Sequence, residues 1–371
     1  MFLKSIDTSG LRKDSETLFD IFDKVVQEVG VENLVQFITD NDASYKAAGK
    51  KLQQKYDSFY WSPCAAHCID LMLENFSDPR HFPVINETIK KARKITKFIY
   101  NHAWVLALMR KDFTKGRDLC RPAQGKEIVE IVLEDREFWA QCQFIVKISE
   151  PLVRVLRLVD GEEKPAMGYL YDAMERAKGN IKARCNNKVS VFNPFIRIID
   201  ARWDKQLHSP LHAAGCFLNP AIYYNPCFKN KNDVARGFMA CVMMIELDID
   251  NQDKIIEKLE LYKNAEGDFG HFLAIRQRDK INPVAWWTNF GHEVPTFQKF
   301  AIREYKKGRD ALDPINLENI DLMEEWVSED SELIDGEDLD WLLDLGNGDK
   351  RVSSFGCFAF LDFDLNPTKE C

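Results

Sequence analysis

The chain has 371 residues, 45% of them hydrophobic, which is enough for one or two buried cores. Its net charge is −9 at pH 7, but the segment from Asp310 to Asp349 holds fifteen Asp or Glu and no Lys or Arg, so the rest of the chain carries +6. No run of about 18 apolar residues is present, so we expect no membrane partner. The N-terminus turns polar too early for a signal peptide, and ten cysteines without a C-x-x-C pair indicate reduced thiols.

Strand-like and helix-like patterns alternate over the first 79 residues. Short apolar runs typical of strands lie at 2–6, 33–39 and 59–61, and helical periodicity covers 11–29, 43–56 and 64–76. Gly30 follows the first helical stripe and supplies a stop signal. Strands that alternate with helices at this spacing predict an α/β unit with a partly parallel sheet.

After Asp78 and Pro79 the pattern becomes helical. We expect helices at 87–108, 125–133, 138–159 and 169–183, an all-helical region up to about Leu261, and one or two further helices over 285–303. From 310 onward the dense negative charge opposes compaction, so we expect 310–371 to be a largely disordered acidic tail. The fold class is therefore α/β but mostly helical.

The expected strand at 33–39 delivers Asp40 to the edge of a sheet, with Asp42 close behind. Hard divalent cations prefer carboxylate oxygens, and an Asp at the end of a strand is where two-metal nucleases place a ligand. An Asp-Asn pair after a strand is equally typical of a turn or a helix cap. The residues alone favour the turn.

Cys64 and His67 have the spacing of half a zinc site at the start of a helix. No second Cys/His pair at short spacing completes it, so a buried Cys and a packed His are the favoured interpretation. We therefore predict no bound zinc and assign no metal ligands.

Two groups of residues are candidates for nucleic-acid contact. Arg202 and Trp203 could pair with a phosphate or stack on a base, although a Trp that anchors one helix to another is the commoner case. The densest basic cluster is typical of a nucleic-acid patch or a nuclear address, and also of a solvated helix face. That cluster consists of Lys90, Lys91, Arg93 and Lys94.

Several blocks of this sequence resemble those of plant hAT-type transposase-derived proteins, and the resemblance runs from Met1 to about Arg303. They are Thr39-Asp40-Asn41, the PCAAHCIDLML block from Pro63 to Leu73, LYKNAEG from Leu261, LHAAGCFLNP from Leu211 to Pro220, and Ala285-Trp286-Trp287. The resemblance implies a ribonuclease-H-like domain that is split by a large all-α insertion. It also implies an Asp-Asp-Glu metal site for DNA strand transfer, with Asp40 as one carboxylate and Cys64 and His67 shaping the site.

On this basis we expect four regions. They are a partial ribonuclease-H-like α/β unit at 1–79, a helical insertion at 80–282, helices that return to the α/β unit at 283–309, and the acidic tail at 310–371. We expect the family's first Asp on a strand before the segment at which this chain begins. The Glu-Arg-aromatic-Ser block that carries the third carboxylate is missing after the tryptophan pair, because Glu304 comes too early to replace it.

One carboxylate of three cannot hold two Mg²⁺ ions about 4 Å apart. We therefore expect a catalytically inactive transposase relative with Asp40 as a vestigial carboxylate. No cofactor is expected, and Mg²⁺ would bind only if the site were completed. The expected partners are DNA, a second copy of the chain or another protein, in the nucleus.

Two alternatives stay open. In one, the chain is a strand-transfer nuclease whose missing carboxylates come from further sequence or from a partner. In the other, the acidic tail makes it a transcription-type interaction protein.

Overall fold

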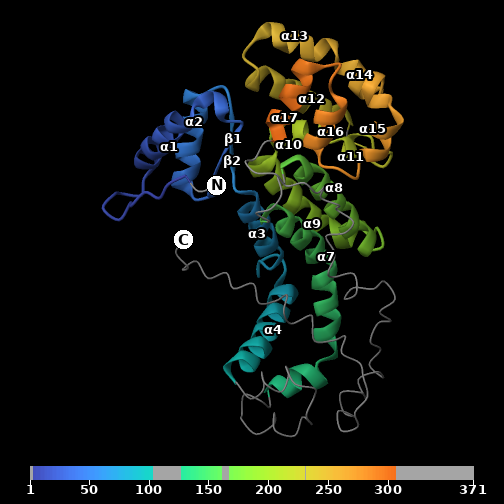
Figure 1. The fold of residues 1–371 in the computed structure, drawn as a ribbon. Helices are drawn as coiled ribbons and strands as arrows, with labels where there is room; N and C mark the ends of the chain where they lie inside the picture. Colours follow the sequence, from blue (N-terminus) through green and yellow to red (C-terminus); the bar gives the residue numbers. More distant parts are fainter. Residues whose placement is uncertain (1–2, 103–126, 161–166, 230, 306–371) are drawn as a thin grey trace. The chain divides into compact units, whose positions relative to one another are not determined.

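The computed structural model describes residues 3–102, 127–160, 167–229 and 231–305 (Figure 1). The predicted acidic tail at 310–371 lies outside this part, as do residues 103–108 and 125–126 of two predicted helices. The described residues are mostly helical and include two strands, in agreement with the predicted mixture of helices and strands. They divide into two packing units: 3–72 with 151–305, and 73–150. The predicted regions with boundaries at 79, 282 and 309 stay a prediction.

The first unit begins with the predicted order of helices and strands. These elements are α1 Ser15–Val29, β1 Gln36–Thr39, α2 Ala43–Lys55, β2 Tyr60–Pro63 and α3 Ala65–Phe76. The two strands pair in parallel, with Gln36 opposite Tyr60 and Thr39 opposite Pro63. The partly parallel sheet is therefore confirmed in the described part of the chain.

The expected strand at 2–6 is wrong over 3–6, which form no regular secondary structure. Leu3 and Ile6 are exposed, at 61% and 41%. The described strands β1 and β2 pair only with each other. A segment with alternating side chains but no ladder partner has no reason to stay extended.

Caps fix where the helices of the α/β part begin and end. The carboxylate of Asp14 accepts a hydrogen bond from the Thr17 backbone N–H (3.0 Å) at the start of α1. Gly30 ends that helix with φ of +87°, a conformation that other residues rarely adopt. Val26, Leu52 and Phe59 form the buried core between α1, α2 and the strands.

The second unit packs α4 Pro83–Asn101 against the helical residues 127–134 and the first part of α7 Arg136–Asp160. Glu130–Glu134 form a π-helical turn. The core between these segments consists of buried apolar side chains of α4 and of the segments that follow 127: Ala92, Ile95, Phe98, Ile99, Ile128, Ile131, Phe138 and Cys142.

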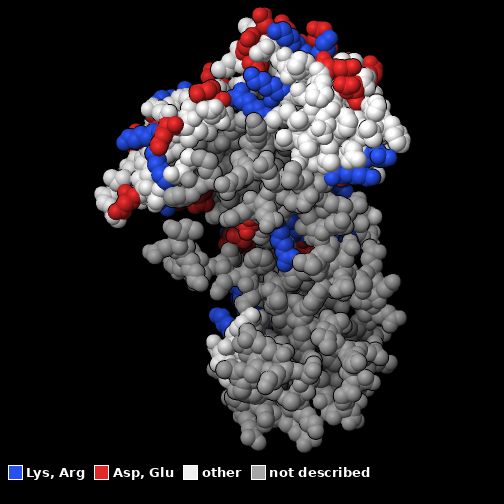
Figure 2. All heavy atoms as spheres, in the orientation of Figure 1, with Lys and Arg blue, Asp and Glu red and all other residues white. Residues whose placement is uncertain are grey.

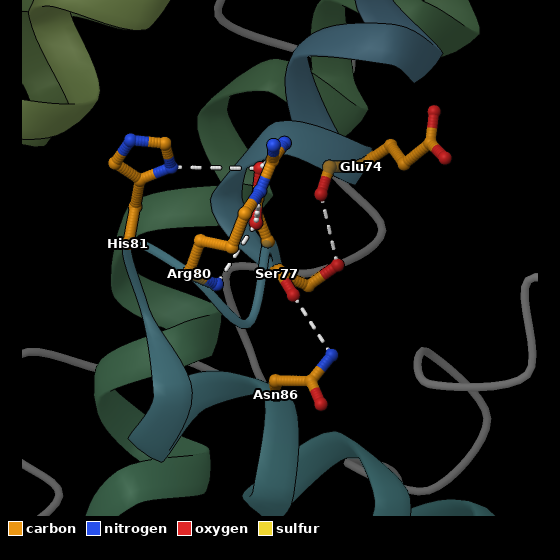
Figure 3. Close-up of polar contacts among 6 residues, drawn as sticks. Glu74, Ser77, Arg80, His81 and Asn86 are labelled. Atoms are coloured by element: carbon orange, nitrogen blue, oxygen red, sulfur yellow. Dashed lines mark hydrogen bonds and ion pairs between the residues drawn. The ribbon is translucent and has the colours of Figure 1, made fainter.

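A polar turn leads from α3 into α4 (Figure 3). The Asp78 carboxylate accepts hydrogen bonds from the Arg80 backbone N–H (2.9 Å) and from its Nε (3.1 Å) and Nη2 (2.8 Å). The Asn86 amide donates to the Ser77 carbonyl (2.8 Å), and the Ser77 hydroxyl donates to the Glu74 carbonyl (2.9 Å). These bonds fix where α4 starts, and with it the basic cluster that α4 carries.

The rest of the first unit is helical in its described residues, as predicted. Its elements are α8 Met167–Arg184, α9 Val189–Arg202, a π-helical turn Trp203–Leu207, α10 Pro210–Phe217, α11 Pro220–Tyr223, α12 Lys231–Ile245, α13 Ile249–Glu257, α14 Leu259–Lys263, α15 Phe272–Gln277, α16 Pro283–Phe290 and α17 Pro295–Tyr305. None of the described helices is long and apolar enough to cross a bilayer.

An aromatic cluster around Tyr262 joins these helices. The Tyr262 ring is fully buried and lies 4.9 Å from the ring of Trp287 and 5.4 Å from that of Phe217. Its hydroxyl donates to the Phe217 carbonyl (2.8 Å), and the Trp287 indole N–H donates to the Leu218 carbonyl (2.8 Å). Buried rings that also satisfy their polar atoms fix α10, α14 and α16 together.

Gly49 offers a test of the contact between α2 and β2. A methyl group at this position would overlap the Trp61 indole, whereas one at Gly179, exposed in α8, meets no described atom within 4 Å. Gly→Ala raises helix propensity by up to about 1 kcal/mol at both sites, while overpacking costs about 1–3 kcal/mol at Gly49 alone. We expect Gly49→Ala to lower the urea midpoint and Gly179→Ala to raise it. Equal shifts for the two variants would contradict this packing.

Candidate functional site

The carboxyl ends of β1 and β2 meet at one edge of the sheet, which we call the strand edge. Asp40 follows β1 directly, and Cys64 follows β2. The Cys64 backbone N–H donates to the Thr39 carbonyl (2.7 Å), which extends the ladder to this point. Because parallel strands end at the same side, two segments 24 positions apart in sequence are brought together here.

His67 lies in the first turn of α3, and its Nδ1 is 3.2 Å from Oδ1 of Asp40. Both side chains are about half exposed, at 43% and 50%. The same Oδ1 accepts the Asn41 backbone N–H at 2.7 Å. The predicted pair of Asp40 and the C-x-x-H segment is thus adjacent in space, and one carboxylate oxygen of Asp40 contacts both the Asn41 N–H and the His67 ring.

Cys64 and His67 belong to no cluster of metal-ligating side chains among the described residues. The Cys64 thiol is half-buried, and it makes no hydrogen bond to a described residue. Among the described residues, no three His, Cys, Asp or Glu side chains lie close enough together to hold a metal ion. The prediction that this chain binds no zinc stays a prediction.

Asp42 serves as a helix cap. Its carboxylate accepts the Ser44 backbone N–H (2.9 Å) at the start of α2, and this bond lowers the pKa of Asp42. A cap at this position explains the second carboxylate of the motif without a metal.

No pattern in the sequence indicates the role of Asn41, the third residue of the Thr-Asp-Asn block. Its side chain is buried, and its Nδ2 donates to the Cys68 sulfur at 3.0 Å. Its Oδ1 has no partner among the described residues. Burial raises the pKa of Cys68 to about 11, against the opposing effects of the Asn41 amide and of the charges of Lys46 and Arg202.

Arg202 therefore lies within electrostatic range of the strand edge, which its position in the sequence does not reveal. Trp203 is buried, with 6% of its surface exposed. Its ring packs edge-on against Tyr171 (5.9 Å between centroids) and stacks on His208 (6.4 Å). A buried Trp cannot stack on a base without local unfolding, so its position fits the helix-anchor interpretation.

The basic cluster of α4 is largely paired within its own unit. Lys90 contacts Glu87 (2.7 Å), Lys94 contacts Glu127 (2.6 Å), and Lys91 forms an ion pair with Asp135. Arg93 is exposed and has no ion pair with a described residue. Glu127 and Asp135, which lie more than thirty positions after their lysine partners, reduce the positive charge of the cluster.

Residues 1–95 match a known family model. Its description is "Domain of unknown function (DUF659)". This family is associated with hAT-type transposase-like plant proteins. The match contains the whole strand edge, including Asp40, Cys64 and His67. In two further comparisons, no curated protein and no solved structure matches the chain.

His212, which packs beside Trp203, predicts how stability depends on pH. Its ring is buried, its Nδ1 lies 2.8 Å from the Leu207 carbonyl, and burial lowers its pKa from 6.5 to about 4. The unfolded state therefore binds a proton below pH 6.5 that the folded state binds only near pH 4, so stability falls as the pH drops.

For this one histidine we expect the free energy of unfolding to fall by roughly 2 kcal/mol between pH 7.5 and pH 5. Urea unfolding at the two pH values measures it, and His212→Gln should reduce the difference by that amount. His208→Gln, a change at a neighbouring exposed histidine, is the control. An unchanged pH dependence in His212→Gln would show that this histidine is accessible to protons in the folded state.

Proposed function

We propose that this chain is an hAT transposase-derived protein that binds nucleic acid or a protein partner and does not cut DNA. The observation that carries the proposal is the engagement of Asp40. Its Oδ1 accepts the Asn41 N–H and lies 3.2 Å from Nδ1 of His67, within the segment that matches DUF659. A carboxylate held in this way acts as a structural acceptor that positions His67 and the start of α2.

The sequence adds support to this proposal. The block with the third carboxylate of the family is missing after Trp287, so the third acid is not expected to join Asp40. Two-metal strand transfer needs carboxylates that bridge both ions. The ribonuclease-H-like character of the α/β part belongs to the same proposal, and the parallel β1–β2 pair followed by α3 is compatible with it.

A binding role has candidate groups at the strand edge. The charges of Arg202 and Lys46 reach Cys68 there, and His67 is half exposed beside them. Lys and Arg side chains are common contacts of a phosphate backbone. The proposal includes a nuclear location, where a DNA-binding protein of this type would act, and association of two copies as one mode of partner binding.

The test is a nicking assay on supercoiled plasmid with Mg²⁺ and with Mn²⁺. We expect the wild type to cut no faster than Asp40→Ala, because one engaged carboxylate cannot bind two metal ions. Asp42→Ala is the matched control, since it removes a neighbouring carboxylate that only caps α2.

Metal-dependent nicking that is lost in Asp40→Ala and kept in Asp42→Ala would contradict the proposal. It would favour the strand-transfer alternative, in which a partner chain or further sequence supplies the missing acids. Mixing the protein with a nuclear extract before the assay extends the test to such a partner.

A further inference from the structure

A cleft of about 430 Å³ lies beside α11 and α15, far in sequence from the strand edge. Its basic residues come from the end of α15 and the turn after it, and its apolar residues from both segments. The lining includes Pro220, Tyr224, Ile275, Arg276, Arg278 and Lys280. Figure 2 shows Lys and Arg side chains at the edge of the surface where Figure 1 places α15.

Arg278 is held in place inside this cleft. Its guanidinium carbon lies 3.6 Å from the centroid of the Tyr224 ring, and its Nη2 contacts the Phe269 carbonyl at 3.5 Å. Tyr224 is itself fixed, because its hydroxyl donates to the Tyr262 carbonyl in the aromatic cluster. A planar cation stacked on a rigid ring keeps its orientation without an acidic partner.

Three cations line the cleft against one acid. Arg276, Arg278 and Lys280 form no ion pair with the described residues, and Asp279 is the one acid in the lining. Lys178 in the same unit, by contrast, contacts both Glu175 (2.5 Å) and Asp200 (3.1 Å). Burial lowers the pKa of Arg278, and its Nε is buried without a hydrogen-bond partner. A partly desolvated, unpaired cation gains from an anion.

We infer that this cleft binds a nucleotide unit, with its phosphate on Arg276 and Lys280 and its base against the Arg278 plane and the apolar lining. The combination of features excludes simpler ligands. A lone inorganic anion would leave the apolar lining unused, and an apolar ligand would leave three cations unpaired. A flat base linked to a phosphate uses both.

The nucleotide unit has two sources, a free mononucleotide or a single strand of nucleic acid. The inference rests on the proposed nucleic-acid binding only for the second source. Fluorescence anisotropy of a labelled thymidine oligomer of about 16 nucleotides, with adenosine monophosphate as competitor, distinguishes them. Competition by the mononucleotide assigns the free nucleotide, and binding of the oligomer without such competition assigns the strand.

The test variant is the full chain with Arg276→Gln and Lys280→Gln together, because both side chains are exposed and lack ion pairs with described residues. The control loses the same two charges outside the cleft, through Arg236→Gln and Lys254→Gln on α12 and α13. We expect the cleft variant to bind the oligomer about tenfold more weakly. We also expect the slope of log binding constant against log salt concentration to fall in magnitude by about 1.4, since each single-strand phosphate contact contributes about 0.7. The control should stay close to wild type.

Four outcomes would overturn the inference. The first three are equal weakening in both variants, wild-type affinity in the cleft variant, and no binding of either nucleotide form by the wild type. The fourth is a cleft variant that loses binding to a peptide of residues 321–345 but keeps binding to the nucleotide. That result would assign the cleft to an acidic peptide. Wild-type affinity in the cleft variant leaves the proposed function standing, whereas the absence of any oligomer binding removes its nucleic-acid part. If the double variant does not fold by circular dichroism, the two single substitutions replace it.

Discussion

The parallel pairing of β1 with β2 is the constraint on which the strand edge depends. The two strands have four residues each and pair in one register, and the hydrogen bond from the Cys64 N–H to the Thr39 carbonyl continues the ladder past their ends. That register sets Asp40 beside the start of α3 and so brings His67 within 3.2 Å of its carboxylate. A slip by one residue would turn Asp40 to the other face and separate the pair.

The aromatic cluster around Tyr262 is the corresponding constraint for the cleft. Tyr262 stacks on Trp287 and receives the Tyr224 hydroxyl on its carbonyl, so the ring on which Arg278 lies belongs to a rigid core. The two candidate sites thus follow different physical rules. At the strand edge, the Asp40 carboxylate contacts the Asn41 N–H and the His67 ring, whereas the cleft keeps cations without ion pairs to the described residues.

Local patterns were sufficient to predict most of the helices and both strands, since the periodicity and the caps of α1 and α2 lie within short segments. The strand end that carries Asp40 was predictable for the same reason. Long-range contacts were not: the strand expected at 3–6 lacks a partner, and Trp203 is buried by Tyr171, which lies far away in sequence. The sequence did not show the carboxylate partners of the basic cluster of α4, because Asp135 is 44 positions from Lys91.

The burial of Cys68 has a consequence for the redox chemistry of the strand edge. With a pKa of about 11, only on the order of one Cys68 in ten thousand is a thiolate at pH 7. Oxidants and alkylating reagents attack the thiolate, so they meet a nearly inert sulfur there. Four positions earlier, the half-buried Cys64 is open to solvent in part. The residue before α3 therefore carries a reachable sulfur and the first turn of α3 a protected one. A thiol-directed label would mark this edge of the sheet through Cys64 and leave Cys68 unmodified.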